Sequence, residues 1–263
     1  MKIRVLGCHG GDFLATNHEE TIRYSQTGFL INQTVALDAG TLCGALPLEE
    51  VIAVRYILLT HAHLDHTAGL ASLSEILLGR IREPVVIISI GAVIDTLRNH
   101  FFNDRLWPDF TQIPSGENPI FRYRKAKVGE SFELERMKIT PIEVNHVVPS
   151  VGYVIEEKNA AVVFSGDTFA TDTLWKVASR VTTLKAAFIE ASFPNELAAL
   201  AQVAGHLTPL SAQIEFTKLK RPDLTLYLYH MKPVYLAEIK RQVEELKGGG
   251  QAILLQEGLR LSF

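Results

Sequence analysis

The sequence predicts an α/β fold in which two mixed β-sheets pack face to face, with helices on their outer faces. Short apolar runs that are typical of strands occur in two groups, one in each half of the chain. Apolar residues at helical spacing follow strands within each group. The chain has 263 residues, of which 47% are hydrophobic and 21% charged, so it can bury a large core. Together these observations favour four layers, in the order helix, sheet, sheet, helix.

The first group of strands lies in the N-terminal part of the chain. Apolar runs indicate strands at 3–6, 28–31, 34–37, 56–59 and 85–90. Between the last two, residues 68–78 carry apolar side chains at helical spacing and are followed by Gly79.

The second group repeats this pattern. Strands are predicted at 138–144, 151–156, 161–164, 186–189, 225–229 and 252–255. Helices are predicted at 171–179, 208–219 and 234–246. The run Gly248, Gly249, Gly250 predicts a flexible connection before the last strand.

No repeat or polar linker divides the chain, so a single domain over 1–263 is expected. Residues 99–124 are rich in Phe, Trp, Pro and Asn without periodicity, which predicts a lid or a long loop. Phe101 and Trp107 are its candidates for stacking on a purine base, although aromatic residues in a loop also serve packing. Exposed apolar residues in this segment favour a homodimer.

Composition argues against several classes of protein. The formal charge of −3 and pI near 6.3 give no general cationic surface, so nucleic acid is not an expected partner. A basic cluster at 122–127 is interpreted as a solvated strand face. The start M-K-I-R-V-L shows neither a secretory signal nor a membrane span, which predicts a cytoplasmic protein. Cys8 and Cys43 lie in unlike contexts, which suits reduced thiols.

The strongest functional signal is T-H-A-H-L-D-H-T-A-G at 60–69. His61 and His63 are two residues apart at the end of an apolar strand, so both rings should project to the same side. Asp65 and His66 follow at a turn into a helix. Imidazoles and a carboxylate around one small volume are the ligands that zinc prefers, and that manganese or iron accept at similar sites.

Further ligands for a second metal occur at the ends of other strands. His146 ends the alternation of Ile142 and Val144, which places it where a buried face meets a loop. Asp167 follows an apolar strand in S-G-D-T, and His230 follows another in L-Y-H-M. Loops at strand ends are where functional groups gather, so these residues are candidates for the same site.

These motifs resemble a known family. The ordered set His-x-His-x-Asp-His, a lone His, Ser-Gly-Asp-Thr and a second lone His is similar to the signature of the metallo-β-lactamase superfamily, and it covers nearly the whole chain. Within that superfamily, H-A-H-L-D-H-T-A-G-L resembles the class II cyclic-nucleotide phosphodiesterases. Three other motifs share this resemblance: I-E-A-S-F-P-N at 189–195, G-H-L-T-P at 205–209 and H-M-K-P at 230–233.

The resemblance implies the metallo-β-lactamase αβ/βα sandwich and a centre of two divalent metal ions, zinc in the first place, with manganese or iron as alternatives. It assigns metal one to His61, His63 and His146, metal two to Asp65, His66 and His230, and the bridging position to Asp167. Two divalent cations outweigh the charge of two carboxylates, so the site should attract a phosphodiester anion.

Two residues are predicted to act in catalysis. Asp65 is expected to orient the nucleophile. His206 follows a glycine just before a predicted helix and is the candidate for protonating the leaving sugar oxygen, the alternative being a capping or core histidine. Glu190 and Ser192 are candidates for orienting the ligands. Surface or loop positions are predicted for the other histidines, His9, His18 and His100.

The leading functional hypothesis is hydrolysis of 3′,5′-cyclic nucleotides, such as cyclic AMP or cyclic GMP, to 5′-monophosphates. The main alternative is a tRNA 3′-end-processing endonuclease, which would need a basic docking arm that no Lys-rich or Gly-rich insertion supplies. Hydrolysis of a thioester, lactone or β-lactam fits the motifs after Asp167 less well. A non-catalytic nucleotide sensor is disfavoured because all seven ligand positions are intact.

Overall fold

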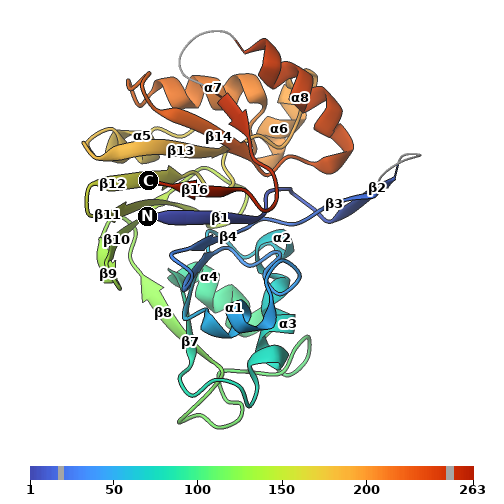
Figure 1. Cartoon of the computed structure of the whole chain (residues 1–263), viewed down its shortest axis with the longest axis vertical. Coiled ribbons are helices and arrows are strands. Elements are labelled where there is room, and N and C mark those ends of the chain that lie inside the picture. The colour runs from blue at the N-terminus through green and yellow to red at the C-terminus, as the bar shows by residue number, and fades with distance from the viewer. Residues whose placement is uncertain (17–20, 247–251) are drawn as a thin grey trace.

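The computed structural model describes residues 1–16, 21–246 and 252–263 and confirms the predicted four layers. Figure 1 shows α6, α7 and α8 over one sheet at the top, and α1, α3 and α4 under the other sheet at the bottom. The predicted flexible run at 248–250 lies outside the described residues, as does His18.

Within the described residues, the first sheet has seven strands in the order β16-β1-β4-β5-β6-β7-β8. Their bounds are Arg260–Ser262 (β16), Lys2–Gly7 (β1), Gly28–Ile31 (β4), Val35–Leu37 (β5), Tyr56–Leu58 (β6), Val85–Ile90 (β7) and Phe121–Ala126 (β8). Neighbouring strands from β5 to β8 run parallel, so their carboxyl ends meet at one edge of the sheet.

The second sheet, counted over the same residues, has the order β15-β14-β13-β12-β11-β10-β9. Its strands are Ala252–Leu254 (β15), Thr225–Tyr229 (β14), Leu184–Glu190 (β13), Ala160–Phe164 (β12), Val151–Glu157 (β11), Met137–Glu143 (β10) and Phe132–Leu134 (β9). The strands from β12 to β15 are parallel, which again gathers their carboxyl ends.

The helices are short. Those of the first half are α1 (Leu48–Ala53), α2 (Leu64–Thr67), α3 (Gly69–Leu77), α4 (Gly91–Thr96) and the π-helix η1 (Leu97–Phe101). Those of the second half are α5 (Thr173–Ala178), η2 (Asn195–Leu197), α6 (Ala198–Ala204), α7 (Pro209–Thr217), η3 (Pro233–Tyr235) and α8 (Leu236–Glu245), of which η2 and η3 are 3₁₀-helices.

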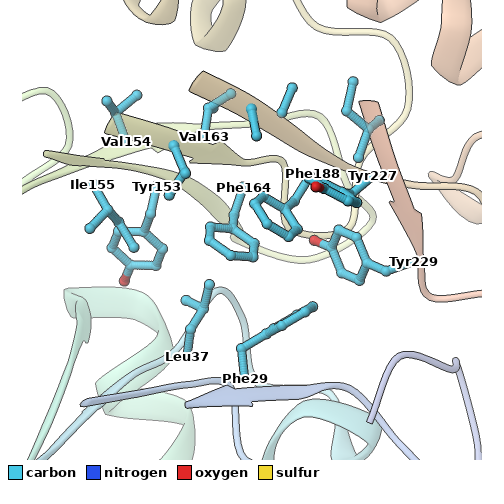
Figure 2. Packing of buried hydrophobic residues seen from close by; sticks show 14 of the residues in the cluster. Phe29, Leu37, Tyr153, Val154, Ile155, Val163, Phe164, Phe188, Tyr227 and Tyr229 are labelled. Atoms are coloured by element: carbon cyan, nitrogen blue, oxygen red, sulfur yellow. The ribbon is translucent and has the colours of Figure 1, made fainter. Parts of the chain in front are cut away.

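Alternation along the strands decides which layer each side chain joins. Phe29 of β4 faces the second sheet and packs on Phe164 and Tyr229 at ring-centroid distances of 5.0 and 5.4 Å (Figure 2). The neighbouring Leu30 points the other way, into a second cluster with Leu70 and Leu73 of α3. The core between the sheets therefore combines packed aromatic rings with many aliphatic side chains, and it fixes the spacing of the strands that carry the polar residues described below.

Several elements were not predicted from the sequence, among them two strands near the N-terminus and the last strand, β16. β2 (Phe13–Thr16) and β3 (Thr21–Tyr24) form a hairpin that projects from the body at the right of Figure 1. β16 pairs antiparallel with β1 in the first sheet, next to the N-terminus, although the chain has just left the second sheet at β15. No helix in the ranges that the structure describes is both long and apolar enough to cross a bilayer.

The segment 99–124 begins in the π-helix and ends in β8. Its aromatic residues Phe101, Phe102 and Phe110 are buried in the cluster between the first sheet and its helices. Trp107 packs against the same cluster, and its Nε1 donates a hydrogen bond to Ser74 Oγ at 3.1 Å. These rings serve the core of the helix layer, so the apolar surface that favoured a homodimer in this segment is largely covered.

Candidate metal centre

The histidine cluster follows β6 as an extended segment that leads into α2. His61 is fully buried, and His63 ends the extended segment as the N-cap of α2. Asp65 and His66 then lie on the first turn of that helix. The helix starts where it does because Gly40 allows close approach: a Cβ on Gly40 would lie 2.0 Å from the carbonyl oxygen of Asp65. The turn and the glycine together aim four polar side chains at one volume.

Three imidazoles form the first group. His63 Nδ1 lies 3.1 Å from His61 Nε2 and 3.3 Å from His146 Nε2. Ligand atoms that bind one tetrahedral zinc ion at 2.0–2.1 Å are about 3.3 Å apart. The spacing of these nitrogens therefore fits a single divalent ion, and these are the three residues that the resemblance assigns to metal one.

Two carboxylates and two imidazoles form the second group. Asp65 Oδ2 is 3.2 Å from His230 Nε2. Asp167 Oδ2 is 3.2 Å from the same nitrogen and 3.3 Å from His66 Nε2. The group has the same spacing as the first, and Asp167 Oδ2 is also 3.6 Å from His61 Nε2. Asp167 thus stands between the two groups.

Backbone conformation brings Asp167 and His230 into the site. Gly166 adopts a φ of +63°, and a Cβ there would lie 2.7 Å from the carbonyl oxygen of Val151. His230 itself has a φ of +63°, which is unfavourable for a residue with a side chain. Its backbone N–H donates to the carbonyl oxygen of Cys8 at 2.6 Å, which helps to hold this conformation.

Unsatisfied polar atoms show that the groups are suited to a bound cation. Among the described residues, His66 Nε2 and both carboxylate oxygens of Asp167 are buried without a hydrogen-bond partner. Leaving a buried polar atom unpaired costs about 1–3 kcal/mol, and more for a charged group. A divalent ion would satisfy all three atoms at once, so the residues fit the binuclear centre that the sequence predicts.

Burial and neighbouring charges set the protonation of the site. Burial holds the pKa of His61 well below its ordinary value, and it also lowers the pKa of His63 and His146, so these rings are neutral. Burial alone would raise the pKa of Asp167, but the surrounding histidines hold it well below its usual range. Neutral imidazole and ionised carboxylate are the forms that bind a metal.

His66 behaves differently because two carboxylates contact it. Burial opposes its charge, but Asp167 and Asp38 outweigh this and raise the pKa of His66 well above its ordinary value.

Asp38 is a supporting residue that the sequence interpretation missed. Its Oδ2 accepts a hydrogen bond from Nδ1 of His66 at 2.8 Å, which leaves Nε2 directed at Asp167. Its Oδ1 accepts from the backbone N–H of Thr60 at 2.8 Å. The available signal was the D-A-G turn after β5, where Asp38 takes a left-handed φ of 57°.

Ser192 and Glu190, the candidates for orienting the ligands, lie beside His230 and His206. Ser192 Oγ is 2.9 Å from Nδ1 of His230 and donates to Glu190 Oε2 at 2.8 Å. Glu190 Oε1 is 2.8 Å from Nδ1 of His206. Burial opposes the charge of His206, but Glu190 outweighs it and raises its pKa. Ser192 thus links the predicted ligand His230 to the predicted proton donor His206.

His206 lies beside the first group. Its ring centroid is 5.0 Å from that of His146, whose Nδ1 donates to the carbonyl oxygen of Gly205 at 2.8 Å. Gly205 ends α6 with a φ of +72°, and a Cβ there would lie 2.8 Å from His146 Nδ1. Only glycine fits this position, which ties the G-H-L-T-P motif to the metal-binding groups.

Other predicted residues lie elsewhere. Phe101 and Trp107 pack under the first sheet, so the structure does not bring them to the centre. His100 lies in the exposed last part of η1. His9 is buried, 2.8 Å from Glu257 Oε1, and its loop pairs with Met231 beside His230. The basic residues at 122–127 lie on exposed positions of β8 and the turn after it.

The sequence is similar to those of known proteins. The model of the β-lactamase superfamily domain matches residues 31–231. A probable 3′,5′-cyclic-nucleotide phosphodiesterase of Yersinia pestis is 30% identical over 76% of this chain, which spans 65% of that relative's length. A ribonuclease Z of Metallosphaera sedula is 30% identical over a region that covers 43% of this chain and 34% of the length of that relative.

A solved structure has the same fold. Unliganded yeast PDE1 superposes with a TM-score of 0.77 at 19% sequence identity, over 100% of this chain and 99% of that one. At this identity the likeness shows the fold, in agreement with the two sheets and outer helices described above. With the family model matching most of the chain, the protein belongs to the metallo-β-lactamase superfamily of hydrolases.

Proposed function

We propose that the protein hydrolyses phosphodiesters at a binuclear zinc centre, with 3′,5′-cyclic nucleotides as the substrates. The observation that carries this proposal is the pair of ligand groups that meet at Asp167, with the His206–Glu190 pair beside them. His61, His63 and His146 would hold one ion and Asp65, His66 and His230 the other, with Asp167 shared. The similarity to the Yersinia pestis phosphodiesterase supports the choice of substrate.

Divalent ions bound there would supply Lewis-acid stabilisation of the phosphate and a water that ionises near neutral pH. Asp65, whose pKa is lowered by His230 against the effect of burial, is ionised and accepts a hydrogen bond from the attacking water, which orients it. The water oxygen bonds to phosphorus as the bond from phosphorus to the 3′ oxygen breaks. The 3′ oxygen leaves with a proton, and the product is a 5′-monophosphate.

In this proposal His206 supplies that proton. Its Nδ1 is engaged by Glu190, so Nε2 is left as the donor toward the leaving oxygen. The carboxylate of Glu190 also stabilises the protonated ring before transfer. This arrangement gives each nitrogen of His206 a separate role, one in positioning and one in proton transfer.

A second candidate is tRNA 3′-end processing, favoured by the similarity to ribonuclease Z over 43% of this chain. Purified protein loaded with zinc or manganese should be given cyclic AMP, cyclic GMP, bis(p-nitrophenyl) phosphate and a precursor tRNA. We expect turnover of a cyclic nucleotide to its 5′-monophosphate. Cleavage of the precursor tRNA alone would replace the proposal by the second candidate, and hydrolysis of none of the four would overturn it.

A further inference from the structure

Large apolar side chains are exposed on the segments that carry the metal-binding residues. Leu64 lies between His63 and Asp65 and is 60% exposed. Val147 directly follows His146 and is 58% exposed. Single exposed apolar residues are ordinary on a protein surface. Their position next to residues that converge on one centre is what calls for an explanation.

These side chains belong to segments that meet at the first group of imidazoles. His63 Nδ1 and His146 Nε2 are 3.3 Å apart, so the segments that carry their chain neighbours Leu64 and Val147 come together at one site. Val203, on the last turn of α6, is 79% exposed. The end of α6 packs here as well, because a Cβ on Gly205 would lie 3.1 Å from the backbone nitrogen of Val147.

The same segments carry almost no positive charge. Lys232 is the one lysine or arginine in the five segments that hold the candidate ligands and His206, which are 60–69, 145–151, 165–170, 190–208 and 229–235. Its Nζ lies 5.4 Å from the ring centroid of Phe193. Proteins that bind polynucleotides neutralise several phosphates with lysine and arginine. One lysine suits one phosphate.

We infer that Leu64, Val147 and Val203 contact the organic group that the substrate keeps after cleavage, and that the substrate is a small monoanionic phosphodiester rather than a polynucleotide. This inference rests on the proposed phosphodiester hydrolysis and adds to it the part of the enzyme that selects the substrate. An apolar rim around a few polar groups is the usual form of a small-molecule site. It binds a base and sugar, or an aryl group, by burying apolar surface.

Two synthetic esters test this inference. Phenyl p-nitrophenyl phosphate and methyl p-nitrophenyl phosphate release the same p-nitrophenolate and differ only in the group that is kept. We expect the zinc-loaded wild type to show a lower KM for the phenyl ester. In the double variant Leu64→Ser/Val147→Ser, KM for the phenyl ester should rise roughly tenfold, the factor that corresponds to losing about 1.4 kcal/mol of apolar burial. KM for the methyl ester should stay near the wild-type value.

Two further variants keep the outcome clear. Leu106→Ser changes a leucine that is equally exposed, at 61%, in the segment between η1 and β8, and it should keep the wild-type preference. Val203 is not next to a candidate metal ligand in the sequence. Val203→Ser should therefore lower the preference for the phenyl ester while both metal ions stay bound. Equal KM values for the two esters in the wild type, or an unchanged preference in the double variant, would overturn the inference. Release of p-nitrophenol from neither ester would instead count against the proposed function itself.

Discussion

Among the residues that the structure describes, the groups that could hold a metal by composition fall into two separate clusters once the groups that share residues are joined, and these clusters differ in one respect. The cluster around Asp167 leaves buried polar atoms of Asp167 and His66 without hydrogen-bond partners. In the cluster of Cys8, His9 and Glu257, the thiol donates to the carbonyl oxygen of Leu255, and Glu257 Oε1 is 2.8 Å from His9 Nδ1.

The difference teaches how to recognise a site that needs a ligand. Each cluster contains a histidine whose Nδ1 lies 2.8 Å from a carboxylate oxygen, His66 with Asp38 and His9 with Glu257. In the first cluster the second ring nitrogen and the next carboxylate remain unsatisfied, whereas in the second cluster the groups satisfy one another. The unsatisfied atoms, rather than the residue types, distinguish the metal centre.

The largest expected effect comes from Asp167. Asp167→Asn replaces one carboxylate oxygen by an amide that cannot bind both ions, so metal content should fall below two ions per chain and phosphodiester turnover should drop to background. Elemental analysis and an assay with bis(p-nitrophenyl) phosphate measure both. Glu257→Gln is the matched change in the other cluster and should keep both ions and full turnover. Retention of two ions in Asp167→Asn would contradict the distinction drawn between the two clusters.

The next effect concerns His206. His206→Ala should lower the rate of cyclic-nucleotide hydrolysis by about 10²- to 10⁴-fold, the usual scale of general acid catalysis, while two ions stay bound. A p-nitrophenyl ester needs no proton on its leaving group, so its hydrolysis should fall much less. Equal losses for the two substrates would argue for a merely structural role, and loss of an ion would show His206 to be a ligand.

A smaller effect should distinguish Asp38 from Glu257, the two carboxylates that contact Nδ1 of a histidine. Asp38→Asn removes the negative charge that orients His66, so metal affinity should fall by about 10- to 100-fold, which a competition titration with a chelator measures. Glu257→Gln should leave the affinity unchanged. A similar loss in both variants would mean that the second cluster also takes part in binding.

The smallest effect is on stability and its pH dependence. Burial alone would raise the pKa of Glu257, but the hydrogen bond from His9 outweighs the effect of burial and lowers this pKa. A carboxylate with a lowered folded-state pKa stabilises the protein above its unfolded pKa of about 4.3 and loses this contribution as the pH falls through the folded value. Glu257→Gln should therefore cost roughly 1–2 kcal/mol at pH 7 in denaturant unfolding, a gap that narrows in acid. A constant gap would contradict this.

The sequence predicted those features that depend on hydrophobic periodicity and on the order of residues within a short segment. Apolar strands that end in His61, Asp167 or His230 are visible as patterns, because each polar residue directly follows a buried run. Convergence of these ends follows from parallel strands that share an edge. Asp38 escaped notice because its role depends on His66, 28 residues away, and no spacing rule connects a turn residue to a particular imidazole.

The remaining differences depend on long-range packing. Nothing local distinguishes a loop rich in Phe and Trp that covers a substrate from one that fills a core, and Phe101 and Trp107 fill the core. β16 is three residues long, with only Leu261 between polar neighbours, so its period gives no signal. Its partner, β1, is fixed only by the closed tertiary structure.

The pairing of β16 with β1 also has a consequence for biosynthesis. β1 is synthesised long before β16 and can pair with β4 soon afterwards, but its other edge stays open until Arg260–Ser262 have been made. For most of translation that strand presents unpaired N–H and C=O groups to other nascent chains. The charged residues Lys2 and Arg4 alternate along β1, and charged residues on an edge strand disfavour pairing with another chain.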